Sequence, residues 1–318
     1  SRAALLFGKG DLLASERLYR QILPRLREGF QKGKVRPIDL ADALNSFAYL
    51  RRTQGDSHEA ELLFREMLAI SPQLPVESRF IAEIHRSTLA STLADEGKFD
   101  EALQTAREAI AAAQRAGHTD TPGFGFSLTV LGGFLTDQRS FNEADAALSQ
   151  AENIFRRYLG PVHLWLGDNL RNQAISLYQQ NRLSEAQIKN DEALKIYNES
   201  FGPHYDQYPT TLITQGLILN KTGKAAEAES ILRQALKLRT DSLPKDHFWV
   251  ALAESALGEC LADEGRKAEA EPLLRNACEV LARKLGSDDP RTRAVRAKLS
   301  FYHFATGGVA GQAIGAPN

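Results

Sequence analysis

The chain has 318 residues, enough for one large domain or two to three ordinary ones. Alanine and leucine contribute 43 residues each and valine only eight, which favours helices because β-branched residues suit strands. A formal net charge of -1 argues against a basic nucleic-acid surface. No apolar run reaches the roughly 18 to 20 residues that span a bilayer. We therefore expect a helical protein that neither binds nucleic acid nor inserts into a membrane.

The first expected element is a helix within residues 1–36. The segment Gly10–Arg20 resembles Gly55–Arg65, which opens the second helix of the first complete repeat described below. Residues 1–36 are therefore predicted to hold the second helix of a partial repeat. The chain begins without Met and without a signal-peptide pattern, so we expect a longer parent protein. Its two cysteines, Cys260 and Cys278, are compatible with a reducing compartment, and we expect a cytoplasmic location.

Residues 37–289 contain an internal repeat of 42 residues. The dipeptide Glu-Ala recurs in one phase, at Glu59-Ala60, Glu101-Ala102, Glu143-Ala144, Glu185-Ala186, Glu227-Ala228 and Glu269-Ala270. A small residue stands twelve positions before each of these alanines, namely Ala48, Ala90, Gly132, Ala174, Gly216 and Gly258. Six copies in phase, without an insertion, indicate one structural unit repeated along the chain.

Each repeat is predicted to be a helical hairpin. In the second copy, apolar residues at positions 89, 90 and 93 form one helical stripe, and alanines at 102, 106 and 109 form another. Gly97 lies between them, and glycine commonly ends a helix in the left-handed conformation. Arg139 and Asn181 replace this glycine in the third and fourth copies. One hairpin cannot bury its apolar face alone, so neighbouring hairpins are expected to stack.

Glycine and proline also mark the connections between repeats. Gly160, Gly202, Pro244 and Gly286 share one phase, and Tyr158–His163 and Phe201–Tyr205 are predicted to be loops. After the last loop, residues 290–306 are predicted to form a capping helix. The glycine-rich residues 307–318 are predicted to be a flexible tail.

These small residues and their spacing resemble the tetratricopeptide repeat, in the 42-residue kinesin-light-chain type that also occurs in bacterial signalling proteins. The resemblance covers about residues 37 to 305. It implies an all-α fold, a right-handed solenoid of stacked antiparallel hairpins with six full repeats and partial end repeats.

The resemblance also implies a binding groove lined by the first helix of each hairpin. The groove residues that we predict to bind a partner are Tyr49, Phe126, Arg171, Ile175, Tyr178, Ile213, Leu217 and Asn220. Acidic residues outnumber basic ones at the groove positions, so a partner with some positive charge is favoured. The lysine and asparagine pattern that clamps a terminal carboxylate is absent. An alternative binding edge contains Trp165 and Trp249, which share one repeat phase.

The sequence gives no sign of catalysis. Gly223-Lys224 does not fit a phosphate-binding loop, because Gly216 is two residues too far away and Ala225 replaces Ser or Thr. The histidines lack metal-ligand spacing, and hydrogen bonding to helix starts is the simpler role for those near loops. We therefore predict a protein- or peptide-binding scaffold that is no enzyme and has no cofactor or metal. The alternative is a regulatory or sensor region cut from a larger bacterial signalling enzyme, such as a serine/threonine kinase.

Overall fold

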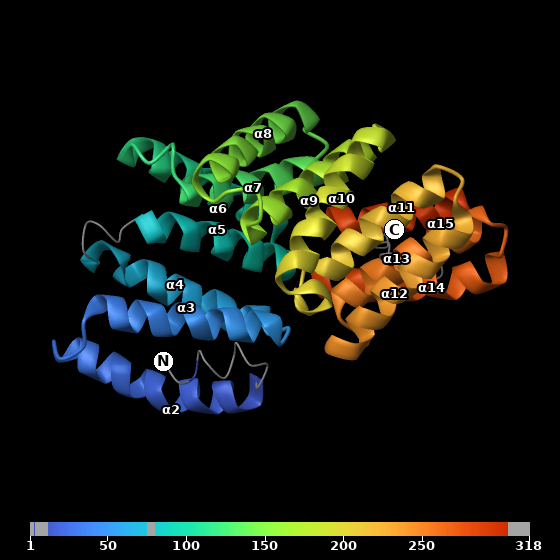
Figure 1. The fold of residues 1–318 in the computed structure, drawn as a ribbon. Helices are drawn as coiled ribbons and strands as arrows, with labels where there is room; N and C mark the ends of the chain where they lie inside the picture. Colours follow the sequence, from blue (N-terminus) through green and yellow to red (C-terminus); the bar gives the residue numbers. More distant parts are fainter. Residues whose placement is uncertain (1–2, 4–11, 75–79, 305–318) are drawn as a thin grey trace, which may run out of the picture. The chain divides into compact units, whose positions relative to one another are not determined.

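The computed structural model describes residue 3 and residues 12–74 and 80–304. Within these residues it contains fourteen α-helices and no strand (Figure 1). The chain divides into two compact units, Ser1–Thr214 and Gln215–Asn318, and the division falls within helix α11. Each unit is described by itself below.

Helices alternate regularly along the chain. Those of the first unit are α2 (Leu12–Gln31), α3 (Pro37–Thr53), α4 (Ser57–Ile70), α5 (Phe80–Asp95), α6 (Phe99–Ala116), α7 (Pro122–Asp137), α8 (Phe141–Tyr158), α9 (Leu164–Gln179) and α10 (Leu183–Ser200). Helix α11 (Tyr208–Lys221) follows, and the second unit continues with α12 (Ala225–Ser242), α13 (Phe248–Asp263), α14 (Lys267–Leu285) and α15 (Pro290–Phe301). Short 3₁₀ turns occupy Ser71–Gln73 and Gly202–His204.

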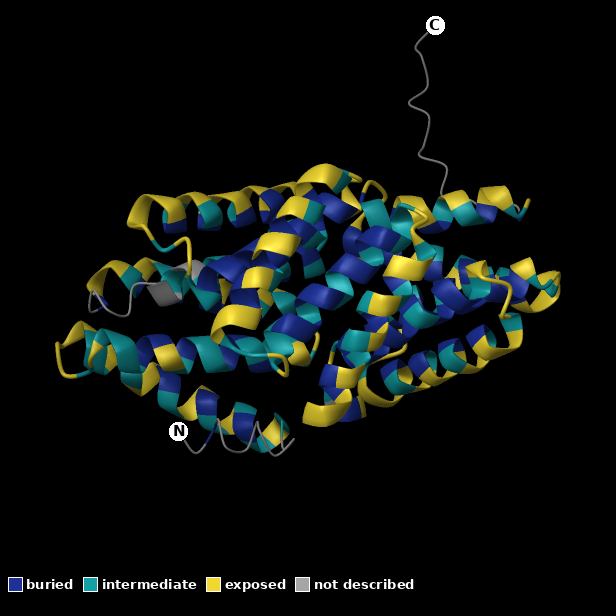
Figure 2. Cartoon of the chain, turned by 45° about the horizontal axis from the view of Figure 1, so that its top comes forward, coloured by how far each residue is buried: buried dark blue, intermediate teal, exposed yellow. Residues whose placement is uncertain are grey.

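The helices pair as the 42-residue period predicts. Helix α7 packs on α8 and α9 on α10, and the first helices α5, α7 and α9 also contact one another in sequence. Gly132 of α7 lies directly against Leu148 of α8, because an added methyl group would come within 2.6 Å of the leucine Cγ. Buried residues follow the faces where helices meet, and exposed residues follow the opposite faces (Figure 2). The prediction of a helical solenoid of stacked hairpins is confirmed.

The turns within the hairpins share one backbone conformation. Gly97 has a φ of 77°, in the left-handed region that glycine enters without strain. Arg139 and Asn181, which replace that glycine, have φ values of 62° and 61°. The turn is therefore kept at both positions, with some backbone strain at Arg139 because a side chain disfavours this region.

The ends of the predicted repeats coincide with helix boundaries. Helix α2 lies within residues 1–36, and α15 covers Pro290–Phe301 of the range 290–306 in which a capping helix was predicted. The repeat boundaries and the capping role stay predictions. The predicted tail, residues 307–318, lies outside the described residues. Among the described helices, none is both long and apolar enough to cross a membrane.

Candidate partner-binding surface

The predicted groove residues are divided between the two units. Six lie in the first unit, and Leu217 and Asn220 lie in the second. Those of the first unit are Tyr49, Phe126, Arg171, Ile175, Tyr178 and Ile213. Ile213 is buried at 9% exposure and offers little surface, whereas the other five are half-buried. Asn220 donates a hydrogen bond to Asp263 at 2.6 Å, within the second unit. The candidate site developed below is therefore confined to the first unit.

We call the surface formed by α3, α5, α7 and α9 at these positions the first-helix face. Its members are Asp42, Asn45, Tyr49, Arg52, Asp95, Phe126, Asp137, Asp168, Arg171, Ile175 and Tyr178.

On α3 and α5 the first-helix face is held by polar contacts between helices. The Tyr49 and Thr88 hydroxyl oxygens lie 3.1 Å apart, and Arg52 Nε donates to Asp95 Oδ2 at 2.6 Å. Burial would lower the pKa of Arg52, but the charge of Asp95 raises it above its usual value. Arg52 and Asp95 thus largely neutralise one another and fix the end of α3 against α5.

On α9 the first-helix face contains a carboxylate held by two tyrosines. Asp168 accepts hydrogen bonds from the hydroxyls of Tyr197 and Tyr205, each at 2.8 Å. The ring of Tyr197 can come this close because Gly167 has no side chain: a methyl group there would lie 2.7 Å from ring carbon Cε1. Burial raises the pKa of Asp168, against the opposing charge of Arg171. The arrangement is a preorganised polar cluster beside Arg171.

Two buried polar atoms of the first-helix face have no hydrogen-bond partner among the described residues. They are the acceptor Asn45 Oδ1 on α3 and the donor Arg171 Nε on α9. Both residues occupy the same position of the 42-residue period, three copies apart. Since buried polar groups are nearly always paired, these atoms are open to an added donor and an added acceptor, from water or from a ligand.

Charged residues of α9 and of the α10–α11 connection affect the pKa values of residues at the C-terminal end of α3. Burial raises the pKa of the Tyr49 hydroxyl, and the negative charges of Asp206 and Asp168 raise it further. The negative charge of Asp206 also raises the pKa of Arg52. In Figure 1 the C-terminal end of α3 points toward this connection. Residues far apart in sequence therefore share one electrostatic environment.

The aromatic residues support the connection between repeats. The rings of Phe126 and Trp165 lie 5.3 Å apart, and Phe155 packs against the same tryptophan at 6.2 Å. His163 Nδ1 accepts a hydrogen bond from the backbone N–H of Trp165 at 3.1 Å, and His247 does the same for Trp249. The predicted role of these histidines at helix starts is confirmed.

A chain of buried hydrogen bonds leads from α7 to the second-helix side. Asn169 donates to Thr129 at 3.0 Å, and the Gln173 amide donates to Asn169 and to Glu152, both at 2.8 Å. Lys189 completes the chain at 2.8 Å from Glu152. There α8, α9 and α10 border a hollow of about 360 Å³, lined by Asp145, Ser149, Glu152, Gln173, Leu177, Arg182, Glu185, Ile188 and Lys189. Its charged groups pair mainly with one another.

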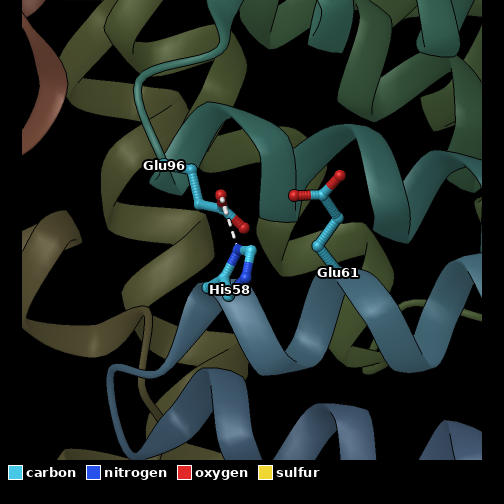
Figure 3. Close-up of side chains that lie close together, drawn as sticks. All are labelled: His58, Glu61 and Glu96. Atoms are coloured by element: carbon cyan, nitrogen blue, oxygen red, sulfur yellow. Dashed lines mark ion pairs between the residues drawn. The ribbon is translucent and has the colours of Figure 1, made fainter.

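One cluster has the residue types of a metal site. The potential ligand atoms of His58, Glu61 and Glu96 lie within 4.8 Å of one another (Figure 3). However, the Lys98 ammonium lies 2.5 Å from Glu61 and 2.9 Å from Glu96, and Arg65 also pairs with Glu61 at 2.6 Å. Both carboxylates already have cationic partners, so the cluster is best described as an ion-pair network between α4 and the α5–α6 turn.

Comparisons with known proteins agree with this architecture. Two family models described as tetratricopeptide repeat match residues 126–199 and residues 211–248 and 254–291. The fold and these matches define a helical repeat protein. The chain contains tetratricopeptide repeats over these residues. No curated protein matches it at a significant level.

Solved structures are similar in fold at low sequence identity. The apo form of RapI has a TM-score of 0.62 and 16% identity, covering 89% of this chain and 96% of RapI. BtubC (BKLC) from P. vanneervenii has a TM-score of 0.56 and 21% identity, covering 72% and 91%. A Rap protein complexed with Competence and Sporulation Factor has a TM-score of 0.55 and 15% identity, covering 95% and 97%.

Sequence reasoning missed the residues that complete the first-helix face from other elements. Tyr197 lies on a second helix, and Tyr205 and Asp206 lie in the α10–α11 connection. A signal for Tyr197 was present in Gly167, a glycine in the first turn of α9 that permits a close ring contact. Tyr205 and Asp206 had no comparable signal, because they lie outside both helices of a hairpin.

Proposed function

We propose that this tetratricopeptide repeat protein is a binding scaffold, and that the first-helix face of its first unit holds an extended segment of a protein or peptide. The observation that carries the proposal is the pair of buried, unpartnered atoms, Asn45 Oδ1 and Arg171 Nε. A peptide backbone presents N–H donors and C=O acceptors in alternation, so it would supply the missing partner to each.

Preorganisation supports the same proposal. Asp168, Tyr197 and Tyr205 are fixed by hydrogen bonds, and the Arg52–Asp95 pair fixes the end of α3. A surface that is already ordered loses less conformational entropy on binding. Ile175 and Tyr178 are half-buried and would add apolar contact area. A Rap protein of similar fold is complexed with Competence and Sporulation Factor, which is a precedent for ligand binding on such an architecture.

The alternative function, a regulatory region of a larger signalling enzyme such as a serine/threonine kinase, would use the same surface. In this alternative, binding at the surface would control an enzymatic activity. A catalytic motif in the same polypeptide would favour it. We propose no catalytic role for the described residues, because the polar clusters serve ion pairing and hydrogen bonding between helices.

Selection from a displayed library of random 12-residue peptides tests the proposal. Peptides selected on the full chain are measured by fluorescence polarisation against the native protein, Arg171→Met and the control Lys195→Ala. Lys195 is exposed on α10, a second helix. We expect Arg171→Met to weaken binding at least about tenfold, the size of one charge-assisted hydrogen bond, and Lys195→Ala to leave it unchanged.

Circular dichroism would first establish that both variants keep the helical content of the native chain. A selection that yields no binding peptide, or only peptides that bind Arg171→Met as tightly as the native protein, would refute the proposed function.

A further inference from the structure

The first-helix face and the neighbouring α10–α11 connection carry more negative than positive charge. The carboxylates are Asp42, Asp95, Asp137, Asp168 and Asp206, and the guanidinium groups are Arg52 and Arg171. Arg52 is paired with Asp95, and Arg171 lies beside Asp168. An incoming anionic side chain would meet an excess of like charge, which selects against acidic partners.

Among these acids, Asp206 has an exposed side chain and directly follows Tyr205 in the sequence. Tyr205 belongs to the hydrogen-bonded cluster with Asp168 and Tyr197. It is anchored by the 2.8 Å hydrogen bond to Asp168 and by ring contact with Tyr197 at 4.8 Å between centroids. The Asp206 carboxylate accepts a hydrogen bond from Gln207 at 3.1 Å and, within the described residues, forms no ion pair. The structure thus holds an exposed carboxylate in a defined place, without an ion-pair partner among the described residues.

The surroundings of Asp206 suit a cation with an aliphatic stem. Asp206 acts electrostatically on Tyr49 and Arg52 of α3 and on Tyr205 and Asp168 on its own side. Tyr49 and Tyr205 are half-buried, and tyrosine rings in general attract cations and cover methylene groups. A lysine or arginine side chain combines both properties.

We propose that the bound segment carries a lysine or arginine whose charged group pairs with Asp206 between the end of α3 and the α10–α11 connection. This inference rests on the proposed function, because it names the chemistry of the partner at that same face. The backbone of the segment is held by Arg171 and Asn45, and the basic side chain sets which segments are accepted. Partners rich in acidic residues are excluded by the same charges.

The peptides selected above provide the probe. We expect their sequences to share a lysine or arginine, and binding to weaken as NaCl is raised from 50 to 300 mM, since salt screens exposed pairs. Asp206→Asn, and separately norleucine in place of the basic residue, should each weaken binding by about three- to fivefold, as for an exposed ion pair. The two changes together should weaken it no more than either alone, because both remove the same pair.

The control variant is Asp191→Asn, which makes the same charge change at an exposed position of α10. It should leave peptide affinity within about twofold, the size of a screened long-range charge effect. If peptides bind in an Arg171-dependent way but tolerate both Asp206→Asn and norleucine, the basic-partner inference is wrong and the proposed function stands. If no peptide depends on Arg171, the proposed function itself fails.

Discussion

Asn190 stands at a core position where three other copies of the repeat have leucine. It is fully buried on α10, and neither its Nδ2 nor its Oδ1 atom has a hydrogen-bond partner among the described residues. The equivalent residues in the third, fifth and sixth copies are Leu148, Leu232 and Leu274. A buried amide without a partner costs about 1–3 kcal/mol of the free energy of unfolding. Asn190→Leu removes that cost with a side chain of the same branching but with bulkier end groups.

The facing residue decides how much of this gain is realised. Each of the three leucines faces a glycine, and a methyl group on that glycine would come within 2.5 to 2.8 Å of the leucine. In the fourth copy, Ala174 stands at the position of these glycines, and Asn190 at the position of the leucines. Crowding in a packed core costs about 1–3 kcal/mol, so we expect Asn190→Leu alone to change the free energy of unfolding by less than about 1 kcal/mol. Ala174→Gly alone should destabilise by about 1 kcal/mol, because glycine is a poor helix former.

The double variant Ala174→Gly/Asn190→Leu restores the glycine–leucine pair. Its free energy of unfolding should exceed the value expected from adding the two single effects by about 1–3 kcal/mol, because glycine at position 174 leaves room for the leucine. Urea denaturation followed by Trp165 fluorescence measures this in a Trp249→Phe background, which leaves one of the two tryptophans. Asn198→Leu, an exposed site on the same helix, is the control and should change little. Additive effects within about 0.5 kcal/mol would refute the packing argument.

Two further predictions concern packing and pH. Gly132→Ala should destabilise the chain by about 1–3 kcal/mol, because its methyl group would overlap Leu148. The control Gly133→Ala, whose methyl group would face only the Asn172 side chain at 3.3 Å, should be close to neutral. Urea denaturation midpoints measure both variants, and equal effects would mean that the helices do not meet at residue 132. Burial lowers the pKa of His85 to about 4. The unfolded chain, with a histidine pKa near ~6.5, then binds the proton more readily, so stability falls as pH drops from ~6.5 to ~4. His85→Gln should remove about 2–3 kcal/mol of that loss, and parallel pH profiles of the two proteins would contradict it.

The repeat and its hairpins could be predicted because they rest on local rules. Six Glu-Ala dipeptides in phase give the period, and glycine at one turn position gives the helix ends. Arg139 and Asn181 keep the left-handed turn despite their side chains, since both ends of the turn are fixed by packed helices. The period thus predicted the backbone even where the local residue was unfavourable.

The candidate site could be predicted only in part, because position in the repeat specifies a face and not its contacts. Tyr49 and Arg171 are half-buried on α3 and α9, but Ile213, one 42-residue period after Arg171, is buried. Asp206 lies in a connection, and its position in the period gives no indication of its contacts. Its relation to α3 depends on tertiary structure that brings together residues more than 150 positions apart.

Hydrogen–deuterium exchange of the full chain, with and without a selected peptide, tests the central claim most directly. Binding at the first-helix face should slow exchange in residues 37–53, 164–179 and 201–208, because the peptide covers α3, α9 and the α10–α11 connection. The second helices α8 and α10 should change little. Protection confined to α8 and α10, around the hollow that they border, or confined to residues 215–304, would contradict the proposed binding surface.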